Sequence, residues 1–466
     1  MKRLTALVAL SGVLALSLPL PSAAQVLVVP LTGTRVHDVQ AASLFHTLFN
    51  DFFLEDDATT YVQTGDIPAM WLRDSSAQTI PYVRFQTAFP ILRGRFAGVI
   101  ERDARNIATD AYANAFQADY HVWERKWEVD SLAWPVVLTW VYWRVTRDRT
   151  IFTPDLHVAL RKIVATYECE EHHRRCNRYE YPYHVSTSYA YADNTGMIWG
   201  AFRPSDDAVK YRFNIPQNAL AAVALNEIVW LAAEGYGDRE LSARARALAA
   251  RVQIGIERYG RFYDARHGWM YAYETDGFGR YNLMDDANLP NLTTLPYLDW
   301  CSTYDPTYRN TRAFVLSKNN PYFFSGRYAS GLGSPHTPVG FVWPLGLIGR
   351  ALTAQSSSEV AQAITTLAVT DGESGTIHES FYADGWWRYT RDEFGWANAL
   401  GAELLFRSLA GYSSTQFGPT GPLVPFEHRT QAPTLVLPLT QLQNAAKMVT
   451  ALGRLLHVEG PLRHGP

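Results

Sequence analysis

The sequence is poor in cysteine and has no long run of basic residues. Only 3 of its 466 residues are Cys, which excludes a disulfide-dense scaffold and allows at most one bridge. Cys169 and Cys176 are the nearer pair, so Cys301 is expected to be a buried free thiol. With a formal charge of −3 and no basic run, the chain is not expected to bind nucleic acid.

Metal-site patterns and late hydrophobic segments are also missing. No Cys/His pattern has metal-ligand spacing; His172 and His173 are adjacent and would face apart on a helix, so we expect neither a metal nor a cofactor. Beyond residue 24, no segment is long and apolar enough to span a bilayer. The chain shows no alternation of strands and helices of the βαβ kind, which argues against a parallel sheet.

The first residues have the pattern of an export signal. Met1–Arg3 is basic, Leu4–Leu20 is apolar, and a proline followed by Ser22–Ala24 forms a small-residue cleavage site. Residues 1–24 are therefore expected to be a signal peptide, with the mature chain starting near Gln25 in the periplasm or outside the cell. An uncleaved anchor is the alternative because the apolar stretch approaches membrane-spanning length, but no stop-transfer pattern follows it.

Helical patterns dominate the rest of the chain. Ile215 opens a predicted helix that stops at Gly235, and after a Gly-Tyr-Gly turn a second predicted helix carries Leu241 and stops at Gly260. Two helices joined this tightly form an antiparallel hairpin. Similar helical segments are expected near residues 38–54, 76–86, 94–113, 131–146, 155–170, 309–317, 341–353, 356–369 and 393–409.

The predicted helices are of two kinds. Leu132–Val145 is apolar nearly all round, as in an enclosed helix, whereas others have a polar face. An inner ring of helices wrapped by an outer ring explains this difference, so we predict an all-α toroid. Trp269–Tyr273 and Trp386–Thr390 are predicted to form short β-hairpins on its rim. No linker divides residues 25–466, which are expected to form a single domain.

Two acidic clusters lie in separate loops, each followed closely by a predicted helix. One holds Asp206 and Asp207, and the other holds Glu379. Cleavage of a glycosidic bond needs two such groups, one protonated and one ionised, and a helix dipole can tune their pKa values. Alternatively, these acids only cap helices or pair with Arg203 and Arg391.

Further loop motifs combine charged and aromatic residues. In Met70–Gln78, Arg73 and Asp74 are suited to bind vicinal hydroxyls while Trp71 covers a sugar face; the alternative is that Asp74 or Ser75 caps the next helix. The other motifs are Glu124–Ser131, Gly331–Pro338 with His336 ahead of Trp343, and Tyr389–Asn398.

Six segments, in order along the chain, resemble the motif series of glycoside hydrolase family 125, which comprises bacterial and fungal exo-α-1,6-mannosidases. The resemblance implies an (α/α)6 barrel, removal of terminal α-1,6-linked mannose from an oligosaccharide or mannoside with inversion, and no metal. Residues 420–466 match nothing in the family. The segments are Met70–Gln78, Lys126–Leu132, Phe202–Ala208, Gly331–Pro344, His378–Phe381 and Phe394–Asn398.

The resemblance also suggests roles for individual residues. It implies that an Asp of the Arg203–Asp207 motif is the general acid and that Glu379 is the general base; Asp206 is preferred, and Asp207 stays open. The residues expected to contact substrate are Trp71, Leu72, Arg73, Asp74, Asp130, Arg203, Ser205, His336, Trp343 and His378.

The chemistry of inversion sets expectations for the acids. Their carboxyl groups should stand roughly 6.5 to 9.5 Å apart, against roughly 5 to 5.5 Å for retention. The acid should stay protonated through burial near Phe202 or a neighbouring carboxylate, and Glu379 should stay ionised with help from His378 or a backbone donor.

Two other classes of function remain open at this point. A toroid also suits glycosidases for other sugars and polysaccharide lyases, and a lyase could use Tyr328 and Arg327. A non-catalytic carbohydrate-binding protein would use the same aromatic residues without turnover. The oligomeric state is left open.

Overall fold

The computed structural model describes residues 47–48, 50–87, 90–176, 179 and 190–409. The predicted signal peptide and residues 420–466 lie outside this part of the chain. Within it, the protein is mostly helical, with short two- and three-stranded sheets between the helices.

The long helices follow the predicted segments closely. They are α3 (Leu72–Thr79), α4 (Pro90–Thr109), α5 (Val129–Thr146), α6 (Pro154–Glu171), α8 (Ile215–Trp230), α9 (Arg239–Tyr259), α10 (Pro306–Val315), α11 (Pro344–Leu352), α12 (Ser357–Val369) and α13 (Gly395–Leu409). Shorter helical segments are η2 (Ile80–Thr87), η3 (Arg149–Ile151), α7 (His173–Cys176), η4 (Leu231–Tyr236) and η5 (Leu292–Thr294).

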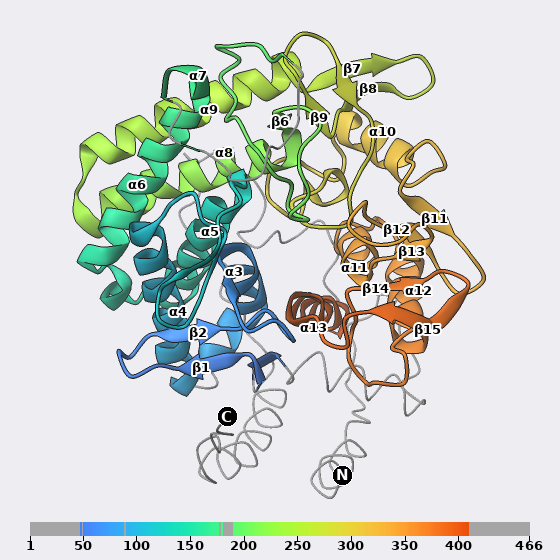
Figure 1. Ribbon diagram of the computed structural model, residues 1–466, viewed down its shortest axis with the longest axis horizontal. Helices are drawn as coiled ribbons and strands as arrows, with labels where there is room; N and C mark the ends of the chain where they lie inside the picture. The colour runs from blue at the N-terminus through green and yellow to red at the C-terminus, as the bar shows by residue number, and fades with distance from the viewer. Residues whose placement is uncertain (1–46, 49, 88–89, 177–178, 180–189, 410–466) are drawn as a thin grey trace, which may run out of the picture.

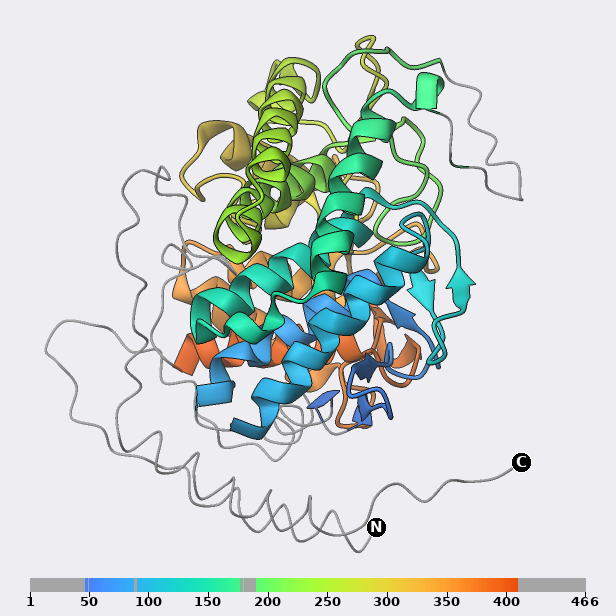
Figure 2. The same ribbon diagram turned by 90° about the vertical axis from the view of Figure 1, so that its left-hand side faces the viewer.

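Helices α3, α5, α8, α11 and α13 surround the middle of the molecule (Figure 1). Neighbours in this group pack directly on one another: α5 contacts α3 and α8, and α13 contacts α3 and α11. Helices α4, α6 and α9 lie side by side outside them (Figure 2). Helix α5 is buried from Val129 to Tyr142, which confirms the prediction of an enclosed helix over that part; Val145, at the end of the predicted segment, is exposed.

The predicted helical hairpin is also confirmed, but its first helix ends at Gly237 instead of Gly235. Helix α8 runs through η4 to a turn at Gly237, whose φ of 65° suits glycine, and α9 returns along it. By length and composition the segment Ile215–Tyr236 could cross a membrane. In this structure it is a core helix: α8 is buried along nearly its whole length between α5 and α9.

The short strands pair antiparallel and connect the helices. The predicted strands near Trp269 and Trp386 are confirmed as parts of the hairpins β7–β8 and β14–β15. The sheets are β1 (Phe52–Leu54) with β2 (Thr60–Val62); β3 (Met70–Trp71), β4 (Ala115–Phe116) and β5 (Val122–Glu124); β6 (Phe213–Asn214), β9 (Glu274–Thr275) and β10 (Tyr281–Asn282); β7 (Arg261–Asp264) with β8 (Gly268–Tyr271); β11 (Phe323–Ser325) with β12 (Ser330–Leu332); and β13 (Phe341–Val342), β14 (Ser380–Tyr382) and β15 (Gly385–Thr390).

Several helix boundaries differ from the prediction; α4 spans Pro90–Thr109 instead of 94–113, and α10 spans Pro306–Val315 instead of 309–317. The helix expected at 38–54 cannot include Phe52–Leu54, which pairs as β1 with β2. Helix α3 begins at Leu72 rather than near residue 76. Helix α11 begins at Pro344 rather than residue 341, because Phe341 and Val342 pair with β14. Strand pairing accompanies the last three of these boundaries: β1 pairs with the nearby β2, Met70 and Trp71 pair with β4 just before α3, and β13 pairs with β14 just before α11.

The cysteines behave nearly as expected. Cys169 and Cys176 form a disulfide that joins the end of α6 to α7. Cys301 is free but partly exposed, so the prediction that it is buried is wrong. It lies in the irregular segment between η5 and α10, where packing is less complete than inside the helical layers.

Candidate active site

A cavity of about 210 Å³ lies where several loops meet the N-terminal ends of helices. Its walls combine acids, cations and aromatic rings, which is the mixture expected of a site for a polar ring. The lining residues are Thr64, Ile67, Trp71, Arg73, Asp74, Pro204, Ser205, Asp206, Asn288, His336, Trp343, Glu379, Arg391, Phe394 and Trp396.

Helices α3 and α11 begin at the cavity with tryptophans in the N-cap position. Trp71 precedes α3 and Trp343 precedes α11, and neither makes a side-chain capping bond. The alternative that Asp74 or Ser75 caps α3 is therefore wrong: both lie buried within its first turn. The positive end of the helix dipole favours an anionic Asp74 at this position.

A tight turn carries Asp206 into the cavity. The backbone N–H of Arg203 donates to the Asp207 carbonyl at 2.8 Å, and that of Asp206 donates to the Arg203 carbonyl at 2.9 Å. Asp206 has a φ of 65°, a left-handed conformation that is uncommon outside glycine and is found often at functional sites. The turn directs Asp206 to the cavity wall and Asp207 elsewhere.

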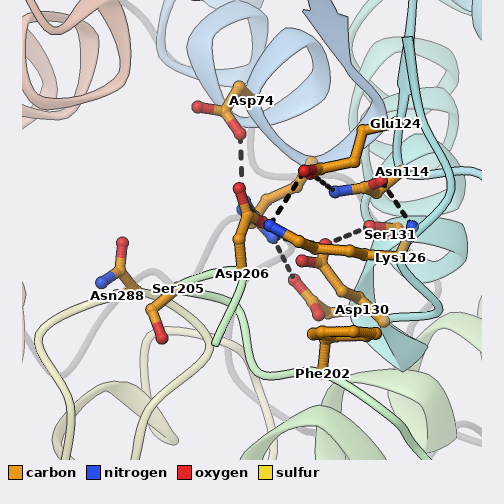
Figure 3. A network of polar contacts seen from close by, with 12 residues as sticks. Asp74, Asn114, Glu124, Lys126, Asp130, Ser131, Phe202, Ser205, Asp206 and Asn288 are labelled. Atoms are coloured by element: carbon orange, nitrogen blue, oxygen red, sulfur yellow. Dashed lines mark hydrogen bonds and ion pairs between the residues drawn. The ribbon is translucent and has the colours of Figure 1, made fainter. Parts of the chain in front are cut away.

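Arg73 lies at the centre of four carboxyl groups. Its Nη2 donates to Asp206 Oδ1 at 3.0 Å and its Nη1 donates to Glu128 Oε2 at 2.7 Å. Asp74 Oδ2 is 3.3 Å from its Nε, and Asp130 Oδ2 is 3.7 Å from its Nη1. Figure 3 shows Asp74, Asp130 and Asp206 gathered in this network, with Lys126 beside them.

The four carboxyl groups around Arg73 differ in their pKa values. Burial raises the pKa of Asp206, but its hydrogen bond with Glu128 and the charges of Arg73 and Lys126 outweigh burial and bring the pKa well below the ordinary range. Burial and the nearby Asp206 raise the pKa of Glu128 well above its ordinary value against the opposing effect of Arg73. Burial likewise raises the pKa values of Asp74 and Asp130 to about 6.

These shifts correct one expectation. Asp206 was predicted to hold its proton through burial near Phe202 or an adjacent carboxylate. In the structure two cations and the Glu128 hydrogen bond favour its ionised form. The ammonium group of Lys126 lies over the Phe202 ring, 5.8 Å from its centroid.

Glu379 directly precedes β14, and its side chain lines the cavity. Its Oε1 lies 3.8 Å from Arg391 Nη1. Arg391 is itself oriented by Asp66, to which its Nε donates at 2.7 Å, and by the Thr64 carbonyl. The predicted pairing of Glu379 with Arg391 is thus present but long, and most of the hydrogen-bonding capacity of Arg391 is used elsewhere.

His378 lies behind Glu379 and does not line the cavity. It is buried, it stacks on Tyr389 with ring centroids 3.7 Å apart, and its two ring nitrogens each lie 2.9 Å from a backbone carbonyl oxygen, those of Arg391 and Asp371. These contacts hold the loop that carries Glu379 against the strand that leads to Arg391. His378 was expected to contact substrate; in the structure it does not line the cavity and instead supports the loop that carries Glu379.

Asp207 pairs with His336 instead of lining the cavity. Asp207 Oδ1 lies 3.4 Å from His336 Nδ1, and Ser205 Oγ donates to Asp207 Oδ2 at 3.3 Å. The hydrogen bond with Asp207, together with the charges of Asp206 and Glu379, outweighs burial and raises the pKa of His336 to about 9. His336 thus brings a positive charge to the cavity.

Three other residues expected to contact substrate lie behind the cavity wall. Arg203 donates to Glu274 at 2.6 Å and thereby anchors the Asp206 turn to β9. Asp130 accepts from Gln217 at 2.6 Å. Leu72 is fully buried in the core. The predicted residues that line the cavity are Trp71, Arg73, Asp74, Ser205, Asp206, His336, Trp343 and Glu379.

Several lining residues were not predicted. Arg391, Phe394 and Trp396 belong to the motif Tyr389–Asn398. The combination of aromatic and charged residues in that motif could have identified them. Phe394 packs edge-on against Trp343, with ring centroids 6.0 Å apart. Nothing in the sequence identified Asn288 as a lining residue. Its backbone and side-chain N–H groups donate to the buried Asp286.

The residues that a lyase could use lie away from this cavity. Tyr328 and Arg327, the residues that a lyase could use, lie between β11 and β12 and do not line it. Among the residues that the structure describes, no group of three or more His, Cys, Asp or Glu side chains is arranged to hold a metal ion.

The chain matches a known protein family and a known relative. A family model described as metal-independent alpha-mannosidase (GH125) matches residues 34–121 and 118–406. The "Meiotically up-regulated gene 157 protein" of Schizosaccharomyces pombe is 34% identical over 390 residues, covering 74% of this chain and 76% of that protein.

Solved structures give the same picture. A metal-independent α-mannosidase of Streptococcus pneumoniae, in a non-productive complex with α-1,6-mannobiose, is 35% identical and covers 81% of this chain and 94% of its own, with a TM-score of 0.77. A bacterial glucoamylase complexed with acarbose is 13% identical and covers 76% of this chain and 50% of its own, with a TM-score of 0.52. At that identity the likeness concerns the fold alone.

Proposed function

The chain belongs to the metal-independent α-mannosidases of family GH125, and from that premise we propose that it removes terminal α-1,6-linked mannose from oligosaccharides with inversion of configuration. We also propose that its two groups of helices form an (α/α)6 barrel with the cavity at one end. The packing of α13, α3, α5 and α8 in succession supports this architecture.

One observation carries the functional proposal: Asp206 and Glu379 enter the same cavity from two separate loops. Asp206 is proposed as the general acid, since it lines the cavity and Asp207 does not. Glu379 is proposed as the general base that takes a proton from water. The related enzyme that binds α-1,6-mannobiose supports the linkage.

The remaining walls suit a terminal sugar. Trp71, Trp343 and Phe394 present flat apolar surfaces, on which the C–H faces of a pyranose can pack. Arg73 and Asp74 offer a donor and an acceptor to neighbouring hydroxyls. The small cavity favours a single end residue over a long internal segment of chain, which is the reason for proposing exo action.

Hydrolysis of α-1,6-mannobiose followed by proton NMR tests the proposal. The first product signal should be β-mannose, and EDTA should leave the rate unchanged. Initial release of α-mannose would contradict inversion, and loss of activity on chelation would contradict a metal-independent reaction. A panel of nitrophenyl glycosides run beside it separates a glycosidase for another sugar, which would prefer a different glycoside, from a binding protein, which would turn over none.

A further inference from the structure

We propose that Glu128 and Asp206 hold one proton between them and that Glu128 is the positioning residue through which Asp206 delivers this proton to the glycosidic oxygen. The inference rests on the function proposed above, in which Asp206 is the general acid. It assigns a role to a buried carboxyl group that does not itself line the cavity.

The geometry joins the two carboxyl groups into one unit. Arg73 bridges them, with Nη1 donating to Glu128 at 2.7 Å and Nη2 donating to Asp206 at 3.0 Å. Ser131 Oγ donates to the same Glu128 oxygen at 2.8 Å. Arg73 thus holds the two carboxyl groups next to each other, and their mutual interaction favours the proton on Glu128. Two ionised carboxylates held in this way repel each other and cannot share a hydrogen bond, because neither has a hydrogen to donate.

The charges around Arg73 also require protons. Four carboxyl groups lie within 4.0 Å of its guanidinium, and all four side chains are at least four-fifths buried. Lys126 is the other cation that acts on Asp206, and it already pairs with Glu124 at 2.9 Å. An excess of buried negative charge is costly unless some of these groups are neutral.

The proton rests on Glu128 before substrate binds. Glu128 is fully buried, and its Oε1 accepts no hydrogen bond from a donor among the described residues. Asp206 instead faces the cavity and is attracted by both Arg73 and Lys126. A pair of carboxyl groups that shares a proton titrates as a unit, so its apparent pKa belongs to the pair.

In the catalytic step, Asp206 first takes the proton of Glu128, which becomes a carboxylate stabilised by Arg73. The glycosidic C–O bond then breaks with its electron pair on the leaving oxygen, and that oxygen takes the proton from Asp206. Water bonds to the anomeric carbon and gives its proton to Glu379. Glu379 returns that proton to solvent, and the pair regains one from solvent.

The variant Glu128→Gln tests the relay because the amide keeps the shape and can donate to Asp206 but has no acidic proton. On α-1,6-mannobiose, kcat should fall by about 100-fold or more. On an aryl mannoside whose leaving group needs little protonation, the loss should be about 10-fold or less. The difference between the two substrates is the signature of lost proton delivery.

The pH profile provides a second readout. In the variant, Asp206 must hold a proton alone beside Arg73 and Lys126, which lower its pKa. It therefore loses that proton at lower pH, and the alkaline limb of kcat/KM should move to lower pH. The charged and titratable groups that act on this pair are Arg73, Asp74, Lys126, Asp130 and His336.

The variant Ser131→Ala should move the alkaline limb of kcat/KM to higher pH. It removes a donor to Glu128, which disfavours the ionised carboxylate and raises the pKa of the pair. If Glu128→Gln does not fold, the pH profile of Ser131→Ala still tests the inference. Glu170→Gln is the matched control: Glu170 is a fully buried acid on α6 that accepts from Tyr112, and its variant should turn over both substrates within about 2-fold of wild type.

The outcomes separate this inference from the proposed function. Equal losses on both substrates with an unmoved alkaline limb would show a purely structural role for Glu128 and overturn the inference, as would an unaffected variant. Failure of the wild type to cleave α-1,6-mannobiose would instead refute the proposed function. In that case infrared difference spectra decide: Glu128→Gln should lose a carbonyl band of a protonated acid at neutral pH, and an unchanged band overturns the shared proton.

Discussion

Asp206 and Asp207 are neighbours with different surroundings. The left-handed backbone at Asp206 reverses the chain so that Asp206 meets Arg73 while Asp207 meets His336. Aspartate tolerates this conformation better than most residues other than glycine and asparagine. One backbone angle thus separates the roles of two chemically identical side chains.

Replacement of each acid should reveal its role. Glu379→Gln should lower hydrolysis by about 10² to 10⁴ on both α-1,6-mannobiose and an activated aryl mannoside, because water must be deprotonated in either case. Asp206→Asn should lose much more on mannobiose than on the aryl mannoside. Initial rates on the two substrates, with circular dichroism to confirm folding, provide the measurement.

Asp207→Asn is the matched control for this experiment. It should show no dependence on the leaving group, since Asp207 does not line the cavity. If Asp207→Asn shows that dependence and Asp206→Asn does not, the acid is Asp207. An active Glu379→Gln variant would remove Glu379 from the mechanism.

His336 should titrate far above an ordinary histidine. Its pKa is raised to about 9, chiefly by Asp207, so the stabilising charge pair is fully present below about 6.5, the ordinary value, and is lost as pH rises through about 9. An NMR titration of the ring should show a midpoint near 9 in the wild type and a lower midpoint in Asp207→Asn. A midpoint that does not change in Asp207→Asn would refute the pairing.

At the scale of elements, helices at the cavity start differently from those outside. The outer helices α6, α9, α10 and α12 begin with side-chain caps from Thr153, Asp238, Asp305 and Ser356. Helices α3 and α11 begin instead at Trp71 and Trp343, which line the cavity. Giving up a side-chain cap costs about 1 kcal/mol, which the packing of these helices in the core offsets.

Two helical glycines should respond oppositely to alanine. Gly94 in α4 is exposed and has open space around it, so Gly94→Ala should stabilise the protein by about 0.5 to 1 kcal/mol. Gly255 in α9 is buried, and an added Cβ would lie 2.5 Å from the Thr195 carbonyl oxygen and 2.8 Å from Met197. Gly255→Ala should destabilise it by about 1 to 3 kcal/mol.

Urea unfolding of the two glycine variants against the wild type measures these changes. The close contact at Gly255 joins α9 to the segment that leads toward the Asp206 turn. If Gly255→Ala proves as stable as Gly94→Ala, α9 does not pack as tightly on this segment as the structure shows.

At the scale of the whole molecule, the export signal remains a prediction from the sequence. Its basic start, apolar stretch and small-residue site predict cleavage before Gln25. N-terminal sequencing of protein from native cells should begin near Gln25, in a soluble periplasmic or secreted fraction. An intact Met1 in the membrane fraction would contradict this prediction and favour the uncleaved anchor.

The sequence by itself determined most of the helices, one strand in each of the β7–β8 and β14–β15 hairpins, the cysteine pair nearest in sequence and the loops that carry the acids. Helical periodicity, glycine stops and the short spacing of Cys169 and Cys176 act over a few residues, and local rules can therefore be read from one segment at a time. The segments near Asp206 and Glu379 were found in this way.

Only the tertiary structure decided which of these residues come into contact and which of the acids stay protonated. Arg73 is 55 residues from Glu128 and 133 from Asp206 along the chain, yet its guanidinium bonds both. The Arg203 side chain donates to Glu274 and not to a carboxylate of the neighbouring aspartates. A pKa depends on burial and on charges within a few ångströms, and these neighbours come from helices and loops that only folding brings together.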